Sequence, residues 1–551
     1  MKRRHLLKQL AVTLPVMALA QKVEAVDKAL NRNFGLMASD PFMPDWNSLS
    51  AYRIPDWFRN AKFGIWAHWG PQCQPEYGDW YAREMYMEGS KKYRYHLETY
   101  GHPSKFGFKD VINEWKADRW NPGDLLALYK KAGAKYFMAL ANHHDNFDLY
   151  KSKYQKNWNS TKIGPKKDLI AGWEKAARAN GLHFGVSVHA AHAWSWMETA
   201  QRADKNGPLA GVPYDGKLTK DDGKGKWWEG LDPQELYAQN HSLSNNSHDN
   251  GTIHKQWNWG NGVSVPSKEY CEKFYNRTVD LIDSYNPDMI YFDDTALPLW
   301  PVSDAGLRIA AHMYNRSIKK HGSVQSVIFG KILDDLQRKC MVWDIERGQS
   351  NTIEPLPWQT DTCIGGWHYD KTIYNDKRYK SAKTIIHTLA DVVSKNGNLL
   401  LNIPVRGNGT IDELERAIVE EIGDWMALYG ESIYDSRPWK VFGEGPAMEA
   451  AAPLSAQGFN EGKGKPFTSS DIRFTTKNDI VYAIVPGWPQ SGKVEIRSLK
   501  ASNAYLNQKI SQVSMLGINA QLSFMQNEEA LVVHLPDKQP ILPYAFAIRI
   551  K

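Results

Sequence analysis

Short apolar runs alternate with amphipathic windows between residues 46 and 434 of the chain. The runs predict buried strands over residues 62–68, 136–140, 183–188, 289–292, 327–329, 341–343 and 398–401. The windows between them, such as residues 121–132 and 168–178, have the apolar spacing of helices. Repeated strand and helix units over this length predict an α/β fold, a (β/α)8-like barrel in which seven strands are identified and the eighth is unassigned.

Two regions depart from this alternation. Residues 198–262 are rich in Gly, Lys, Asp and Asn and too long for a simple connection, which predicts an insertion over the barrel mouth. After residue 434, alternating segments at 480–485, 494–496, 531–535 and 545–550 are separated by turn residues, as in a β-sandwich. We therefore expect a barrel domain over residues 27–435 and a C-terminal β-sandwich over residues 436–551.

Residues 1–20 have the composition of a signal peptide. Basic residues at positions 2, 3, 4 and 8 precede an apolar stretch, and Ala18 and Ala20 form a small-x-small cleavage site. Arg3 and Arg4, followed by two leucines and a lysine, resemble the twin-arginine signal, although an ordinary secretion signal would explain the same residues. Both alternatives predict export to the periplasm or the medium of a bacterium.

Charge and cysteine content exclude several classes of protein. The net charge of +7 is small for 551 residues and four of the basic residues lie in the predicted signal peptide, so neither a nucleic-acid partner nor a membrane partner is expected. The four cysteines, Cys73, Cys271, Cys340 and Cys363, form no C-x-x-C pair, which argues against a zinc knuckle and leaves one disulfide possible. The 22 Trp and 26 Tyr favour a protein that stacks aromatic faces on carbohydrate, although aromatic residues also fill large cores.

Histidine or aspartate stands at the end of each of the first four predicted strands. The residues are His68, the pair His143 and His144, His189, and the pair Asp293 and Asp294. On its own Asp293 could equally cap the next helix or turn. The C-terminal ends of parallel barrel strands open on one mouth, however, so these side chains are expected to converge on an active site.

Two chemistries could use such a cluster. Histidines and carboxylates can hold zinc, or they can hydrogen-bond sugar hydroxyls while two carboxylates cleave a glycosidic bond. His143 and His144 cannot both face the barrel axis in a regular strand, and tryptophans lie beside the histidines. These observations favour a sugar and leave a metal-dependent hydrolase as the alternative.

Five ordered motifs carry a family resemblance. They occupy residues 57–70, 79–81, 143–147 with 158–160, 286–293, and 394–402. In this order they resemble the α-L-fucosidases of glycoside hydrolase family 29, and residues 437–445 resemble the start of that family's β-sandwich. The resemblance implies a retaining exo-glycosidase that acts on an oligosaccharide and needs neither a metal nor a cofactor. The sandwich would either bind sugar or brace the barrel, and bracing is favoured because it contains no compact aromatic cluster.

The resemblance also implies roles for individual residues. Asp293 takes the place of the family's nucleophile, and Asp294 is its neighbour. Glu346, at the end of another predicted strand, is the expected acid/base, with Glu354 as the main rival and Asp344 third; alternatively, Glu346 forms a structural ion pair. The residues expected to hold the substrate are His68, Asp79, Trp80, Tyr81, His143, His144, His189, Tyr291 and Trp367.

Three departures from the family leave the identity of the released sugar open. Asp79 replaces a frequent Glu, His189 lies where tyrosines are common, and Tyr291 replaces a usual Trp. We therefore expect release of terminal α-L-fucose or of a closely related galacto-configured sugar. An exo-α-galactosidase-like enzyme acting on algal galactans and an inactive sugar-binding protein stay open as alternatives.

Overall fold

The computed structural model describes residues 40–551 except 239, 450, 455–457, 503–504, 506–508 and 519–520. The predicted signal peptide, residues 1–20, lies outside the described residues. No helix in the described part of the chain is both long and apolar enough to cross a bilayer. All four cysteines are described, and each is buried and unpaired.

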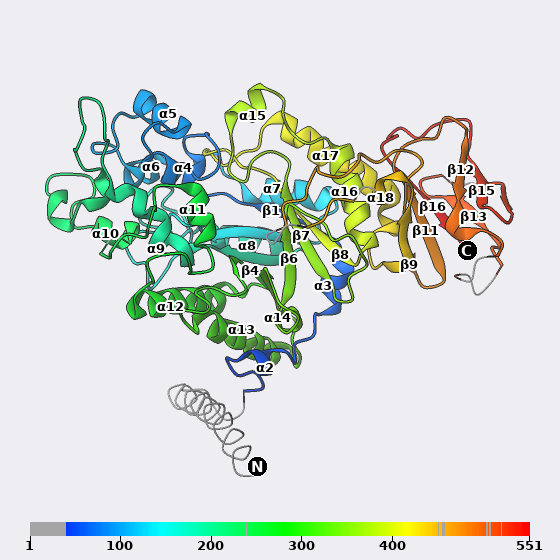
Figure 1. Ribbon diagram of the computed structural model, residues 1–551, viewed down its shortest axis with the longest axis horizontal. Helices are drawn as coiled ribbons and strands as arrows, with labels where there is room; N and C mark the ends of the chain where they lie inside the picture. Colours follow the sequence, from blue (N-terminus) through cyan, green and yellow to red (C-terminus); the bar gives the residue numbers. More distant parts are fainter. Residues whose placement is uncertain are drawn as a thin grey trace, which may run out of the picture. The chain divides into compact units, whose positions relative to one another are not determined.

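Eight parallel strands form a closed barrel in chain order, with β1 paired to both β2 and β8 (Figure 1). The strands are β1 (Phe63–Ala67), β2 (Tyr136–Asn142), β3 (His183–Val188), β4 (Met289–Thr295), β5 (Val327–Lys331), β6 (Val342–Glu346), β7 (Trp358–Cys363) and β8 (Gly397–Asn402). Each of the seven predicted strands overlaps one of these. The predicted barrel, followed by antiparallel β-sheets, is confirmed.

The unassigned eighth strand is β7, whose sequence is polar although every residue in it is buried. Gln359 Oε1 accepts a hydrogen bond from the Tyr136 hydroxyl at 2.9 Å, and Thr360 Oγ1 donates one to the carbonyl of Ile345 at 2.8 Å. Polar side chains can be buried when their hydrogen bonds are made inside the protein. A search for apolar runs therefore misses this strand.

Helices connect the strands, and their ends follow local signals. The larger ones are α7 (Pro122–Lys131), α8 (Leu169–Ala179), α12 (Lys268–Tyr285), α13 (Ala305–His321), α16 (Ala382–Ser394) and α17 (Glu413–Tyr429). Asp168 caps the start of α8 by accepting a hydrogen bond from the Ala171 amide. Asn286 ends α12 in the left-handed conformation, and Pro287 follows it directly before β4.

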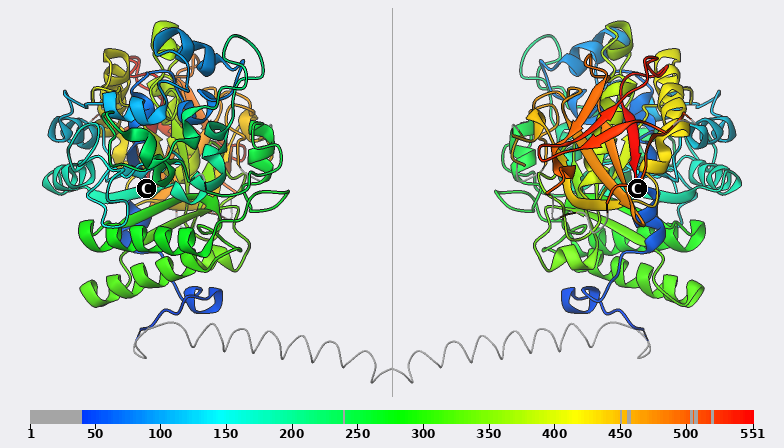
Figure 2. Two further views of the ribbon diagram at one scale, coloured as in Figure 1. Left: turned by 90° about the vertical axis from the view of Figure 1, so that its left-hand side faces the viewer. Right: turned by 90° about the vertical axis from the view of Figure 1, so that its right-hand side faces the viewer.

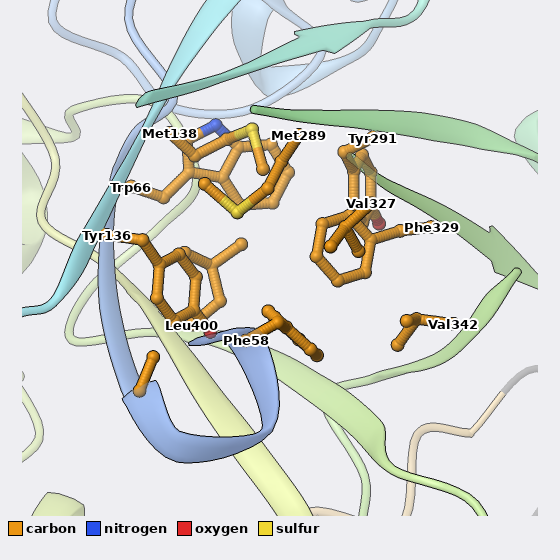
Figure 3. Packing of buried hydrophobic residues seen from close by; sticks show 11 residues of the cluster. Phe58, Trp66, Tyr136, Met138, Met289, Tyr291, Val327, Phe329, Val342 and Leu400 are labelled. Atoms are coloured by element: carbon orange, nitrogen blue, oxygen red, sulfur yellow. The ribbon is translucent and has the colours of Figure 1, made fainter. Parts of the chain in front are cut away.

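Side chains two residues apart on β2, β4 and β5 pack together in the barrel interior. Figure 3 shows Tyr136 with Met138, Met289 with Tyr291, and Val327 with Phe329 in one cluster. A strand alternates its side chains between two faces, so the next inward positions after the pairs on β4 and β5 lie at the C-terminal mouth. The same rule makes Asp293 and Lys331 the last inward side chains of β4 and β5.

Short helices in two long connections pack together beside the mouth. The β1–β2 connection contains α4 (Tyr81–Glu84), α5 (Lys91–Thr99) and α6 (Phe108–Glu114), and the β3–β4 connection contains α9 (Ala193–Trp196), α10 (Pro233–Tyr237) and α11 (Asn250–Lys255). Buried Asp215 joins them by accepting hydrogen bonds from the hydroxyls of Tyr86 and Tyr237 and pairing with Lys109. Residues 250–257 are held at the mouth by other bonds: Asn250 accepts from Arg83 at 3.0 Å, and Trp257 Nε1 donates to the Asp293 carbonyl at 3.2 Å.

The C-terminal module contains two antiparallel sheets. One has the order β13-β16-β11-β10-β9, visible in orange and red in the right-hand view of Figure 2, and the other the order β12-β15-β14. The strands are β9 (Arg437–Glu444), β10 (Ile472–Lys477), β11 (Ile480–Val485), β12 (Lys493–Ile496), β13 (Val513–Met515), β14 (Phe524–Gln526), β15 (Leu531–His534) and β16 (Phe546–Ile550). Helix α16 packs against β9 and β10.

Buried Asp391 links the barrel to this module. Its carboxylate pairs with Lys395 at 2.7 Å on the same helix and with Arg473 of β10 at 2.5 Å. The variant Asp391→Ala would leave two buried cations without their partner, so we expect a loss of about 3–5 kcal/mol of stability. Chemical unfolding of both proteins measures this loss. A midpoint unchanged from wild type would show that the ion pair does not brace the two parts.

Candidate active site

A pocket of about 450 Å³ opens at the C-terminal ends of the barrel strands. From the strand ends and their following loops it is lined by Trp66, His68, Asp79, Trp80, His143, His189, Tyr291, Asp293, Asp294, Lys331, Ile332, Glu346, Arg347, Asp361, Trp367 and His368. The remaining lining residues are Glu84, Lys92, Asn250, His254, Trp257 and Phe459. Trp66 and Tyr291 also belong to the barrel core, so the pocket floor is continuous with the packed interior.

Asp293 is held as an ionised carboxylate. Lys331 Nζ lies 2.6 Å from its Oδ1, while His144 Nε2 and His189 Nδ1 lie 3.2 and 3.4 Å from its Oδ2. Burial by itself would raise the pKa of Asp293, but the Lys331 charge and the two histidines outweigh burial and hold it well below its ordinary value. An ionised, partly exposed carboxylate at the end of a barrel strand can act as a nucleophile.

Glu346 shares the Lys331 ammonium with Asp293, but the pKa of Glu346 is raised whereas that of Asp293 is lowered. Lys331 Nζ donates a hydrogen bond to Glu346 Oε2. Burial raises the pKa of Glu346 to about 7, and the nearby carboxylates of Asp293 and Asp361 add to the rise while Lys331 opposes it. Two carboxyl groups whose surroundings push their pKa values apart are suited to act as nucleophile and proton donor.

The rival carboxyl groups occupy different places. Glu354 accepts a hydrogen bond from Ser350 and pairs with Arg338 at 3.4 Å, and it is not among the described residues that line the pocket. Asp344 lies one layer deeper in the barrel, where Gln359 donates a hydrogen bond to it at 2.7 Å. Burial raises the pKa of Asp344 well above its ordinary value. Of the three candidates, only Glu346 is next to Asp293 in the pocket.

Lys331 lowers the pKa of both Asp293 and Glu346. Replacing it with methionine removes the charge, so we expect both limbs of the kcat/KM profile to move to higher pH and activity at the wild-type optimum to fall about a hundredfold. Lys331→Arg keeps the charge and should keep both limbs closer to their wild-type positions. Profiles of the three proteins test this, and limbs that do not move in Lys331→Met would show that the ammonium does not control either carboxyl.

Neighbouring side chains fix the protons on two pocket histidines. Gln72 Oε1 accepts from the Ala82 amide, which points Gln72 Nε2 at His143 Nδ1 at 2.8 Å, so the proton of neutral His143 is on Nε2. His368 Nδ1 donates to Asp79 at 3.3 Å, so in the neutral form of this ring Nε2 is an acceptor. The floor therefore presents a donor beside an acceptor, an arrangement that can distinguish the orientation of hydroxyl groups.

The pocket brings together seven of the nine residues expected to hold the substrate, namely His68, Asp79, Trp80, His143, His189, Tyr291 and Trp367. Tyr81 is a correction, because it is fully buried with its hydroxyl 2.8 Å from His96 Nδ1 and does not reach the pocket. His144 is a partial correction. It lies behind the lining, where it contacts Asp293 and donates from Nδ1 to the His189 carbonyl at 2.7 Å.

His143 and His144 both approach the active site, although two adjacent residues of a regular strand could not both face the barrel axis. Strand β2 ends at Asn142, so both histidines follow the strand and the alternation of faces does not apply to them. Their rings meet edge to face with centroids 4.4 Å apart. Both therefore approach the same site, one in the lining and one behind it.

Several pocket residues were not predicted. Lys331 is the last inward side chain of β5, so the alternation of inward and outward positions could have identified it from the sequence. Asp361 lies near the end of β7. His368 follows the predicted Trp367 directly. His254, Trp257 and Phe459 come from outside the barrel strands, and no local pattern marks them.

Comparisons with known proteins agree with this fold. The profile of the Alpha-L-fucosidase family matches residues 31–431, and that of the Alpha-L-fucosidase C-terminal domain matches residues 465–551. The tissue alpha-L-fucosidase of Mus musculus is 26% identical over 527 residues, covering 94% of this chain and 95% of the relative. The alpha-L-fucosidase of Branchiostoma floridae is 25% identical over 520 residues, covering 93% of this chain and 96% of the relative. The structure of the Thermotoga maritima alpha-fucosidase with a mechanism-based inhibitor superposes with a TM-score of 0.65 at 25% identity, covering 92% of this chain and 99% of that one.

Proposed function

The chain belongs to the alpha-L-fucosidase family of glycoside hydrolases, and from this premise we propose that it releases terminal α-L-fucose, or a closely related galacto-configured sugar, from oligosaccharides with retention of configuration. The observation that carries the proposal is the arrangement of Asp293 and Glu346 around Lys331 in one pocket. The proposed reaction has two steps.

In the first step the Asp293 carboxylate attacks the anomeric carbon while Glu346 gives its proton to the glycosidic oxygen. The bond to the leaving group breaks, and the alcohol departs with that proton. In the second step the ionised Glu346 takes a proton from water, whose oxygen attacks the anomeric carbon and frees Asp293. The low pKa of Asp293 and the raised pKa of Glu346 match these starting states.

The spacing of the two carboxyl groups supports the retaining course. Lys331 Nζ is within hydrogen-bonding distance of Asp293 Oδ1 and Glu346 Oε2, so those oxygens are no more than roughly 6 Å apart. Retaining enzymes need about 5–5.5 Å between their carboxyl groups, whereas inverting enzymes need about 6.5–9.5 Å to admit a water.

The lining suits a sugar with both polar and apolar edges. His143 Nε2 offers a donor and His368 Nε2 an acceptor for hydroxyl groups, while Trp66 and Trp367, with ring centroids 5.6 Å apart, form an apolar wall. L-Fucose carries a methyl group in place of a hydroxymethyl group, and an apolar wall favours the methyl group. A galacto-configured sugar with its hydroxymethyl group would need a polar partner, for which His189 is available.

A metal-dependent mechanism is less compatible with the pocket. Among the described residues, two groups of three histidines are close enough to hold a cation, His68 with His143 and His368, and His143 with His144 and His189. Both include His143, whose Nδ1 accepts from Gln72 and whose Nε2 carries the proton. A metal ligand needs a free lone pair, so binding would require this hydrogen bond to break.

We also propose that the enzyme acts outside the cytoplasm, because residues 1–20 have the features of a signal peptide.

The function is tested by measuring turnover of aryl α-L-fucoside, α-L-galactoside and α-D-galactoside together with fucosylated and algal oligosaccharides, each with and without a chelator. We expect the α-L-fucoside to be the best aryl substrate and the chelator to leave its turnover unchanged. Loss of activity in the chelator would favour the metal-dependent alternative. Preference for a galactoside would show that the released sugar is galactose and not fucose. No turnover of any substrate would favour a sugar-binding protein.

A further inference from the structure

A loop of the C-terminal module reaches the pocket of the barrel. Residues 458–461 lie between β9 and β10, and Phe459 is one of the residues that line the pocket. Phe459 is 37% exposed. An aromatic side chain left in solvent at the edge of a binding pocket is available for an apolar contact with a ligand.

Backbone hydrogen bonds join this loop to the end of β6. The Phe459 amide donates to the Glu346 carbonyl, and the Glu461 amide donates to the Arg347 carbonyl, both at 2.9 Å. Gly458 has φ +97°, and a Cβ there would lie 2.6 Å from the Glu346 carbonyl oxygen. Glycine is therefore the residue that permits so close an approach.

Side chains hold the loop in this position. Glu461 pairs with Lys380 at 2.7 Å and Arg347 at 3.1 Å, and it accepts a hydrogen bond from Thr362 at 2.6 Å. Asn460 accepts from the Gln349 amide at 2.8 Å and donates to the carbonyl of the same residue at 3.0 Å. The loop is thus tied to β7 and to the segments that follow β6 and β7, so Phe459 has a defined position.

The position of Glu346 indicates which part of a substrate would meet Phe459. A proton donor must lie next to the glycosidic oxygen, and the leaving group extends outward from that oxygen. The Phe459 amide is bonded to the Glu346 carbonyl, and the partly exposed Phe459 lines the same pocket as Glu346. The terminal sugar, by contrast, would occupy the floor formed by the histidines.

We propose that Phe459 is a specificity-determining residue that forms an apolar wall of the leaving-group subsite, so that the enzyme selects substrates whose leaving group is a sugar with an apolar C–H face. This inference rests on the proposed function and deepens it. Aromatic rings stack on such faces, and Trp257 and Trp80, which stacks on His254, line the same pocket from connections of the barrel. The module would thereby contribute directly to substrate choice.

The experiment compares two substrates that differ only in the leaving group. α-L-Fucosyl fluoride has a single-atom leaving group that cannot reach Phe459, whereas a fucosylated trisaccharide fills the subsite. For Phe459→Ala we expect kcat/KM for the trisaccharide to fall about tenfold and kcat/KM for the fluoride to stay within about twofold of wild type. Phe459→Tyr keeps the ring and should keep most of the activity on the trisaccharide.

The possible outcomes are distinguishable. An equal loss on both substrates would mean that the loop acts only through Glu346, and no loss on either would mean that Phe459 does not contact the leaving group; each overturns the proposal. If wild type hydrolyses neither substrate, the proposed function itself fails. If it prefers another sugar, the fluoride and an oligosaccharide of that sugar are used in the same comparison.

Discussion

Asp293→Ala is expected to lower kcat/KM for an aryl α-L-fucoside by about four orders of magnitude or more. The substitution removes the carboxylate that Lys331, His144 and His189 hold in its ionised form. Without it no covalent intermediate forms, and the positioned acid alone gives little rate. Added azide should fill the vacated space, attack the sugar from the same face and give the β-glycosyl azide. Steady-state kinetics and analysis of the azide product measure both effects.

Asp294 supplies the matched control on the same strand. Asp294 also borders the pocket, but its carboxylate is buried and its Oδ1 lies 2.9 Å from His192 Nε2. We expect Asp294→Asn to keep activity within about tenfold of wild type, since the carboxylates paired with Lys331 are those of Asp293 and Glu346. A larger loss from Asp294→Asn than from Asp293→Ala would reverse the assignment of the nucleophile.

Glu346→Ala should affect substrates according to their leaving groups. A poor leaving group needs a proton in the transition state, so we expect a loss of about a hundred- to ten-thousandfold, whereas a fluoride leaving group needs little protonation and should lose much less. In wild type, kcat/KM should fall above about pH 7 as Glu346 loses its proton. That basic limb should disappear in the variant. Azide should now attack the accumulated glycosyl-enzyme from the face that Glu346 has left and give the α-glycosyl azide.

Glu354→Gln is the comparison for this prediction. Glu354 is bound by Ser350 and Arg338, so its substitution should change neither the basic limb nor the product with azide. An α-glycosyl azide obtained from a Glu354 variant, and none from Glu346→Ala, would move the acid/base role to Glu354.

The barrel could be predicted from the sequence because most of its strands are apolar. Met289 and Tyr291 point inward from β4, and their spacing also places Asp293 at the mouth. Strand β7 was missed because its burial depends on partners such as Tyr136 and Ile345, which are distant in the chain. Hydrogen bonds between distant residues leave no periodic pattern.

The site was predictable to the extent that it follows the strands. Lys331 obeys the same alternation as Asp293 and could have been identified, although a lysine after a buried strand is usually expected to reach solvent. Phe459 and Trp257 could not, because they reach the pocket through long connections whose course depends on tertiary contacts. Tyr81 was misplaced because the backbone at Trp80 takes the left-handed conformation, and the next side chain turns into the core.

Covalent labelling of the nucleophile is the most direct test of the proposed retaining mechanism. In 2-deoxy-2-fluoro-α-L-fucosyl fluoride the substituent at C2 slows both steps while the fluoride leaving group speeds the first, so a glycosyl-enzyme should accumulate. After digestion, mass spectrometry should find the modified sugar attached to Asp293, in the peptide that contains residues 289–295. Attachment to Asp294 or Glu346, or turnover of the fluoride without any covalent adduct, would contradict a retaining mechanism through Asp293.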